Sequence, residues 1–108
     1  MAKLYNFPNH ESGDTFPGVT FTVNVNSTPL DLADSDIIAT FQHTISADVS
    51  YILSVGNGRL IIDDNDGIFS LIEQIIEFIP GLYSYEITFQ LSDGSIKTYI
   101  QGTWKILK

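Results

Sequence analysis

Two stretches in the first half of the chain alternate between apolar and polar residues with a period of two. In residues 19–26 the apolar positions are Val19, Phe21, Val23 and Val25. Residues 36–43 repeat the pattern with Ile37, Ala39 and Phe41. Because successive side chains of a strand point to opposite faces, both stretches are predicted to be half-buried β-strands. Ile38 lies on the polar face, either as a contact residue or as one of the single exposed apolar residues that soluble proteins carry.

The C-terminal quarter of the chain is predicted to form one long β-hairpin. Residues 82–91 and 96–107 flank Asp93-Gly94, a dipeptide that favours the two-residue type I′ turn. Such a turn sets which residues face each other. The predicted pairs on the buried face are Leu91 with Ile96, Phe89 with Thr98, Ile87 with Ile100, Tyr85 with Gly102, and Tyr83 with Trp104. The opposite face is polar and includes Tyr99 beside Thr88.

Two further segments have less regular patterns. Residues 51–55 and 59–63 are expected to pair as a hairpin closed by Gly56-Asn57-Gly58. Residues 71–79 contain isoleucines at helical spacing opposite polar residues. However, β-branched side chains disfavour a helix, and Pro80-Gly81 would end it at once. We therefore expect a short helical turn or an irregular crossover in residues 71–79.

The spacing of turns predicts the fold class. Turn-forming residues recur about every eight to twelve positions, a rhythm typical of β-sandwiches and barrels. The segment Gly81-Leu82-Tyr83-Ser84-Tyr85 resembles the tyrosine corner of immunoglobulin-like sandwiches, with Tyr85 where antibody domains carry a disulfide cysteine. We predict an all-β, immunoglobulin-like antiparallel β-sandwich of about seven to eight strands. It would form a single domain over residues 1–108.

Composition and charge argue against several classes of function. Hydrophobic residues make up 44% of the chain and charged residues 17%, which is too apolar for a disordered protein. The chain has no cysteine, and therefore no disulfide, thiolate metal site or cysteine nucleophile. Its net charge of −8 would repel phosphate backbones, so no nucleic-acid partner is expected. Polar residues interrupt the most apolar stretch, residues 68–79, so no membrane partner is expected.

The strongest candidate for a metal site is the acidic turn that contains Asp63, Asp64 and Asp66. Hard cations such as Ca²⁺ prefer several carboxylate oxygens. An EF-hand alignment fails at its first ligand, because Ile62 has no side-chain oxygen. We therefore interpret this segment as a turn, with a calcium site of another type as the alternative, and we expect no cofactor.

Catalytic patterns are weak. His10, Ser12 and Asp14 are the residue types of a catalytic triad, but so short a loop cannot supply the geometry or the oxyanion hole. The sequence has no glycine-rich phosphate loop, and most of its aromatic residues are already assigned to the core rather than to a substrate groove. We expect that the protein is not an enzyme.

Several segments resemble one family of phage proteins. They are Gly13-Asp14-Thr15-Phe16, Thr28-Pro29-Leu30-Asp31-Leu32, Ile61-Ile62-Asp63, Gly67-Ile68-Phe69, residues 80–87 and residues 93–104. Together they are similar to the N-terminal β-sandwich module of phage baseplate upper proteins and of related prophage-encoded virion proteins. The resemblance implies a virion structural role, in a tail, baseplate, neck or head-decoration component, with no catalytic residues.

This resemblance also implies partners and a location. The partners would be other virion proteins and further copies of the chain, in the virion and in the host bacterial cytoplasm during assembly. Sheet edges and exposed apolar residues would supply the contacts. The candidate contact residues are Ile38, Tyr99, Ile75 and Ile76.

Two other functions stay open. One is a carbohydrate-binding or adhesin module that recognises a host surface. Such a module needs an exposed aromatic platform, and Tyr5, Tyr51 and Tyr99 are the tyrosines not assigned to the core. The other is an immunoglobulin-like domain of a larger bacterial surface assembly, which a signal peptide would favour.

Overall fold

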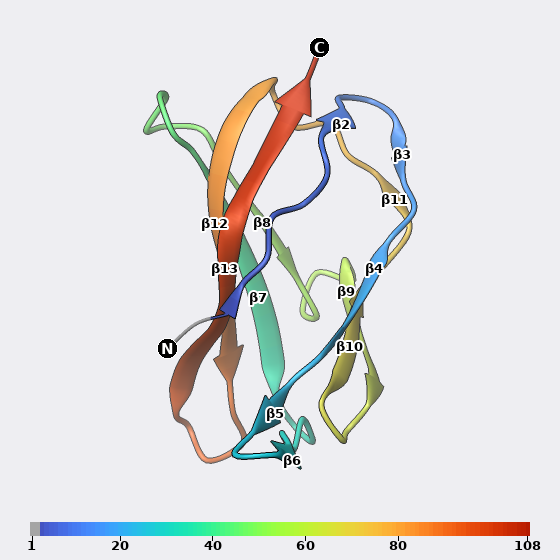
Figure 1. Ribbon diagram of the computed structural model, residues 1–108, viewed down its shortest axis with the longest axis vertical. Helices are drawn as coiled ribbons and strands as arrows, with labels where there is room; N and C mark the ends of the chain where they lie inside the picture. The colour runs from blue at the N-terminus through green and yellow to red at the C-terminus, as the bar shows by residue number, and fades with distance from the viewer. Residues whose placement is uncertain (1–2) are drawn as a thin grey trace.

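The computed structural model describes residues 3–108, and within that range all regular elements are β-strands (Figure 1). The strands are β1 (Lys3–Leu4), β2 (His10–Glu11), β3 (Thr15–Phe16), β4 (Val19–Thr22), β5 (Asn24–Val25), β6 (Thr28–Pro29), β7 (Asp36–His43), β8 (Ser50–Ser54), β9 (Leu60–Asp64), β10 (Ile68–Leu71), β11 (Gln74–Ile75), β12 (Gly81–Gln90) and β13 (Ile96–Leu107). Six of them have only two residues, which leaves seven strands of four or more. The predicted all-β class is confirmed. No helix that could cross a membrane occurs in the described range.

The strands form one large sheet and three smaller ones. The large sheet has the order β1-β13-β12-β7-β8, and β2 pairs with β13 further along the same edge. The second sheet has the order β4-β10-β9, and two short ladders join β3 with β11 and β5 with β6. Strands β1 and β2 run parallel to β13, whereas the other ladders are antiparallel. Figure 1 shows the large sheet on one side and β4, β9 and β10 on the other, an arrangement consistent with a β-sandwich.

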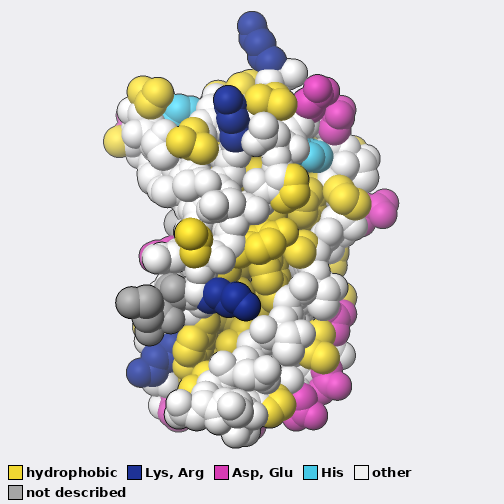
Figure 2. Space-filling model, viewed as in Figure 1, with side chains coloured by type: hydrophobic (Ala, Val, Ile, Leu, Met, Phe, Trp, Pro, Cys, Tyr) yellow, Lys and Arg dark blue, Asp and Glu magenta, His cyan; other side chains and the backbone are white. Residues whose placement is uncertain are grey.

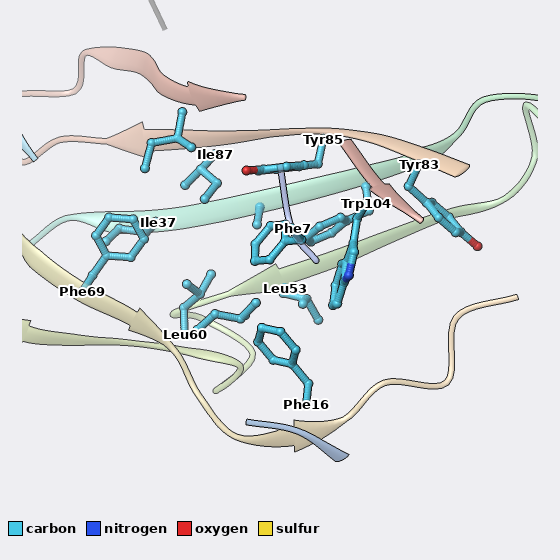
Figure 3. Packing of buried hydrophobic residues seen from close by; sticks show 14 of the residues in the cluster. Phe7, Phe16, Ile37, Leu53, Leu60, Phe69, Tyr83, Tyr85, Ile87 and Trp104 are labelled. Carbon is cyan, nitrogen blue, oxygen red and sulfur yellow. The ribbon is translucent and has the colours of Figure 1, made fainter. Parts of the chain in front are cut away.

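The core between the sheets is rich in aromatic side chains (Figure 3). Most residues predicted on the buried face of the long hairpin are buried, namely Tyr83, Tyr85, Ile87, Phe89, Ile100 and Trp104. The predicted pair nearest the turn is wrong, because Ile96 is 65% exposed and Leu91 is only half-buried. Trp104 packs against rings from distant parts of the chain, with its ring centroid 4.7 Å from that of Phe7 and 5.2 Å from that of Phe16. Edge-to-face and tilted aromatic pairs each add about 0.5–1.5 kcal/mol beyond the burial of apolar area.

Tyr83, in the segment that resembles a tyrosine corner, makes a hydrogen bond back to the residues before β12. The hydroxyl of Tyr83 donates to the carbonyl oxygen of Ile79, four residues upstream, at 2.6 Å. Tyr83 is fully buried, and the hydroxyl of the neighbouring Tyr51 accepts a hydrogen bond from the Ile79 amide at 3.1 Å. Burial, followed by the proximity of Tyr51, raises the pKa of Tyr83 to about 12. This corner ties the start of β12 to the segment that precedes it.

The register of the long hairpin agrees with the prediction at its base and differs near its turn. The confirmed pairs are Ile87 with Ile100, Tyr85 with Gly102, and Tyr83 with Trp104. Nearer the turn the pairing is shifted by one residue, so that Phe89 faces Lys97. The predicted type I′ turn is wrong, because Gly94 has a positive φ (89°) and Asp93 does not. A longer loop with one left-handed glycine replaces it.

A β-bulge at Tyr99 restores the predicted register. Ile87 pairs with Ile100 and Thr88 with Thr98, so Tyr99 is the extra residue on β13. The bulge turns Tyr99 away from its predicted place beside Thr88. Its half-buried ring packs edge-to-face on Phe89, with centroids 5.3 Å apart. The one-residue shift at the turn and the extra residue in the strand therefore cancel.

The N-terminal segment packs against the edge of β13. Main-chain hydrogen bonds join Tyr5 N–H to the Gln101 carbonyl at 2.8 Å and Phe7 N–H to the Thr103 carbonyl at 3.0 Å. The hydroxyl of Tyr85 also donates to the Tyr5 carbonyl oxygen. A Cβ atom on Gly102 would lie 1.9 Å from that oxygen, so only glycine permits this approach.

Two predictions about the middle of the chain are corrected. Of the two alternatives for residues 71–79, the helical turn is wrong: the segment is an irregular crossover in which only β11 is regular, paired with β3, and Ile76 is buried. Residues 51–55 and 59–63 do not pair as a hairpin, because β8 joins β7 in the large sheet whereas β9 joins β10 in the second sheet. The chain changes sheets at the Gly56-Asn57-Gly58 turn, which is closed by main-chain bonds from Gly58 N–H to the Val55 carbonyl and from Arg59 N–H to the Ser54 carbonyl.

Replacing Gly102 by alanine should loosen the N-terminal segment. We expect Gly102→Ala to lower the free energy of unfolding by about 1–3 kcal/mol, the usual effect of overpacking. Gly56→Ala is the matched control, because its added Cβ would meet no atom closer than 3.7 Å and its φ is not positive. Urea unfolding measures both variants. Equal stability of the two would contradict the close approach at Gly102.

The raised pKa of Tyr83 predicts alkaline destabilisation. A tyrosine that ionises at about 12 in the folded state and at about 10 when unfolded stabilises the fold fully below pH 10. This contribution is lost as pH rises from 10 to 12, so the free energy of unfolding should fall across that window.

The variant Tyr83→Phe should show a smaller alkaline fall, with a loss of about 1 kcal/mol at neutral pH from the missing hydrogen bond. Tyr99→Phe is the control, because the Tyr99 hydroxyl makes no side-chain hydrogen bond within the described residues. Unfolding curves at pH 7, 10 and 11.5 make the comparison, and an unchanged alkaline slope in Tyr83→Phe would exclude this residue as the cause.

Candidate interaction surface

The acidic turn does not assemble a metal site. The Asp64 carboxylate accepts a hydrogen bond from the Asp66 amide at 2.9 Å, which closes the turn, and the Asp63 carboxylate accepts one from the Ser70 hydroxyl. Across residues 3–108, no three histidine or acidic side chains lie close enough together to hold a metal ion. These aspartates therefore serve the turn between β9 and β10 in this structure.

The triad-like residues near the N-terminus are also engaged in separate contacts. His10 hydrogen-bonds through Nε2 to the main-chain carbonyl of Asp14 at 3.0 Å, and the Ser12 hydroxyl donates to the carbonyl of Phe78 at 2.7 Å. No hydrogen bond links the Ser12 hydroxyl to the His10 ring in this region, so the two side chains do not form a nucleophile–base pair.

The four predicted contact residues fall in different environments. Ile75 is 54% exposed on β11, whereas its neighbour Ile76 is buried in the core and offers no contact surface. Ile38 is half-buried on the outer face of β7. Tyr99 is half-buried in the bulge. Of these residues, Ile75 therefore presents the most surface to a partner.

Ile75 lies in a groove beside the edge of the large sheet. The groove has a volume of about 520 Å³ and lies between β8 and the segment of residues 74–78. Ile52, 57% exposed on β8, also lines it. Arg59 and Glu77 add one positive and one negative charge to the same lining. We call this region the isoleucine groove.

The free edge of β8 is largely closed by one side chain. The antiparallel pattern directs the main-chain groups of Ser50, Ile52 and Ser54 away from β7. Asn57 accepts a hydrogen bond from Ser54 N–H at 2.9 Å and donates one to the Ile52 carbonyl at 2.9 Å. Its side-chain amide thus takes the place of a neighbouring peptide group, which hinders pairing with another chain.

The edge of β4 has no such cover. Val23 N–H bonds to the Gly67 carbonyl on the β10 side, so the alternation of an antiparallel ladder turns the main-chain groups of Thr20 and Thr22 the other way. Within residues 3–108 these groups have no hydrogen-bond partner. Strand β4 therefore presents unpaired donors and acceptors along one side.

A second groove runs beside this open edge. It has a volume of about 490 Å³ and separates β4 from the N-terminal segment. Its lining includes Tyr5, Phe21, Tyr99 and Val19, and Lys3 is the one charged residue among the lining residues described. Figure 2 shows hydrophobic side chains exposed in an oblique channel on this face of the molecule. We call this region the β4 groove.

Comparison with known proteins identifies no relative. No family model, no curated protein and no solved structure matches the chain.

The sequence did not reveal the residues that define these surfaces. The local pattern predicts only a turn at Asn57, which lies between two glycines. It places Thr20 and Thr22 on the polar face of a strand. The uncharged run Val19–Thr22 gives no sign of an edge, because exposed edge strands usually carry a charge, a proline or a bulge. Only the sheet order shows that β4 is an edge.

Removing the Asn57 side chain should open the β8 edge. We expect Asn57→Ala to lower the free energy of unfolding by about 1–2 kcal/mol, because Ser54 N–H and the Ile52 carbonyl lose their hydrogen-bond partner. The opened edge should also promote aggregation. Asn57→Asp is the matched control, because it keeps the acceptor for Ser54 N–H and loses the donor to Ile52. Thermal unfolding and light scattering on heating measure the two effects. An alanine variant as stable and soluble as the parent would refute the capping role.

Proposed function

We propose that the protein is a non-catalytic structural component of a phage or prophage particle, in a tail, baseplate, neck or head-decoration position. It acts by binding other copies of itself and other virion proteins. The observation that carries the proposal is the exposed apolar surface beside strand edges, above all the isoleucine groove. Neither the triad-like residues nor the acidic turn forms a catalytic grouping, which agrees with a binding role.

We also propose that the sandwich is immunoglobulin-like in topology. Strand order supports this assignment, because β13-β12-β7-β8 corresponds to the G-F-C-C′ sheet and β4-β10-β9 to the B-E-D part of the other sheet. The hydrogen bond of Tyr83 to Ile79 supplies the tyrosine corner, and Tyr85 stands where the second disulfide cysteine would be. Such sandwiches act through edges and loops, as the proposed role requires.

The charges of the isoleucine groove favour a second copy as its occupant. A two-fold symmetric contact brings the same patch from both copies together. Arg59 of one copy can then face Glu77 of the other, while Ile52 and Ile75 pair across the axis. The patch is therefore complementary to itself in charge and in apolar character.

The carbohydrate-binding alternative lacks its aromatic platform. Tyr51 stacks face-to-face on Phe78 with centroids 4.1 Å apart, and Tyr5 packs edge-to-face on Phe21 at 5.4 Å. Tyr99 is half-buried against Phe89. Tyr5 and Tyr99 both line the β4 groove, but all three rings are half-buried and pack on a phenylalanine ring, which disfavours stacking of a sugar on them.

Self-association can be tested by light scattering during size-exclusion chromatography. We expect a defined oligomer for the unmodified chain and about a tenfold weaker association for Ile75→Glu, because a charge would be buried at the contact. Ile45→Glu is the matched control, since Ile45 is 88% exposed on the loop between β7 and β8. A monomer at every concentration up to about 1 mM, together with binding to a glycan array, would favour the carbohydrate alternative.

A further inference from the structure

The free edge of β4 differs from the other strand edges in having no protection. Strand β8 is capped by Asn57, and β9 carries Asp63 and Asp64 next to a bulge in its ladder with β10. Strand β1 has only two residues and begins with Lys3. Charges, bulges and short length are the usual means of preventing edge-to-edge association. Strand β4 carries no charge and no bulge over its four residues, and its sequence Val-Thr-Phe-Thr favours β-structure.

The unpaired groups of β4 match the needs of one added strand. Thr20 and Thr22 each direct an N–H and a C=O toward the β4 groove, at the two-residue spacing with which strands pair. The rings of Tyr5 and Phe21, 5.4 Å apart, form an apolar floor beside them. An extended segment here could bond to the edge with its main chain and bury alternate side chains on the floor.

We infer that the β4 groove accepts an extended strand from a different protein, and that this strand carries an acidic residue which pairs with Lys3. This inference rests on the proposed assembly function and names the kind of partner that the groove takes. Strand addition at β4 would extend the β4-β10-β9 sheet by one strand.

Charge decides between a different protein and a second copy. Lys3 is the one charged side chain among the described groove residues, so the groove favours an acidic strand. The β4 strand of a second copy, Val-Thr-Phe-Thr, offers no acidic residue. A two-fold β4–β4 contact therefore leaves Lys3 without a counter-charge.

Amide hydrogen exchange measured by NMR on the ¹⁵N-labelled full chain tests strand addition directly. The probe is a capped synthetic peptide of sequence Glu-Val-Thr-Val-Thr-Val-Glu. Without it, the Thr20 and Thr22 amides should exchange rapidly although they lie within a strand. With the peptide, both should slow by about tenfold or more, because they gain hydrogen-bond acceptors. A peptide with alternate N-methylated residues should give no protection.

Two substitutions separate the main-chain and charge contributions. Thr20→Pro removes an N–H that makes no bond within the described domain, so the fold should survive while peptide binding weakens by about tenfold. Thr20→Val is its control, because it loses the same hydroxyl but keeps the N–H. Lys3→Glu should reverse the charge preference, so that a Lys-ended peptide binds better than the Glu-ended one.

The outcomes distinguish this inference from the proposed function. Fast exchange of both threonine amides at millimolar peptide, or equal binding by Thr20→Pro and Thr20→Val, would overturn strand addition while leaving self-association through the isoleucine groove intact. If both amides become protected as the protein concentration rises, with no peptide present, the strand that occupies the groove comes from a second copy and not from a different protein. Loss of self-association in Ile75→Glu with peptide binding unchanged would support two separate surfaces.

Discussion

The packing of aromatic rings around Trp104 holds the separate parts of this small domain together. Phe7 comes from the N-terminal segment, Phe16 from β3 and Phe41 from β7, and each ring lies within 5.5 Å of the Trp104 ring, centroid to centroid. The indole N–H donates to the Pro8 carbonyl at 2.9 Å, which satisfies its polar group within the core. Because the chain has no disulfide, this cluster and its hydrogen bonds must keep the N-terminal segment against β13.

The position of the N-terminal segment in turn creates the main surface feature. Because β1 and β2 pair with β13 and not with β4, they extend the large sheet and leave the second sheet with a free edge. Gly102 makes this arrangement possible by admitting the Tyr5 carbonyl. The pairing of the N-terminal segment with β13 therefore completes the core and also leaves the main-chain groups of Thr20 and Thr22 exposed. The contact that stabilises the N-terminal segment is thus also the one that leaves this edge free.

The edges of the sandwich show how a small β-protein can restrict its associations. An amide side chain covers β8, charges and a bulge protect β9, and β4 stays open beside an apolar groove. A protein that avoided every contact would protect all of its edges. Under the proposals above, this uneven protection limits strand pairing to β4, and the isoleucine groove supplies a second contact made by side chains.

The sequence by itself determined the strands whose patterns are local. The alternation in residues 19–26 and 36–43, the core positions of the long hairpin and the tyrosine corner of Tyr83 all follow from the two-residue period of a strand or from a short motif. Only the tertiary structure decided which strands are neighbours. It placed β8 and β9 in different sheets, buried Ile76, inserted the Tyr99 bulge and left β4 at an edge. Local patterns cannot determine these features, because each depends on contacts between residues far apart in the chain, as the approach of Tyr5 to Gly102 shows.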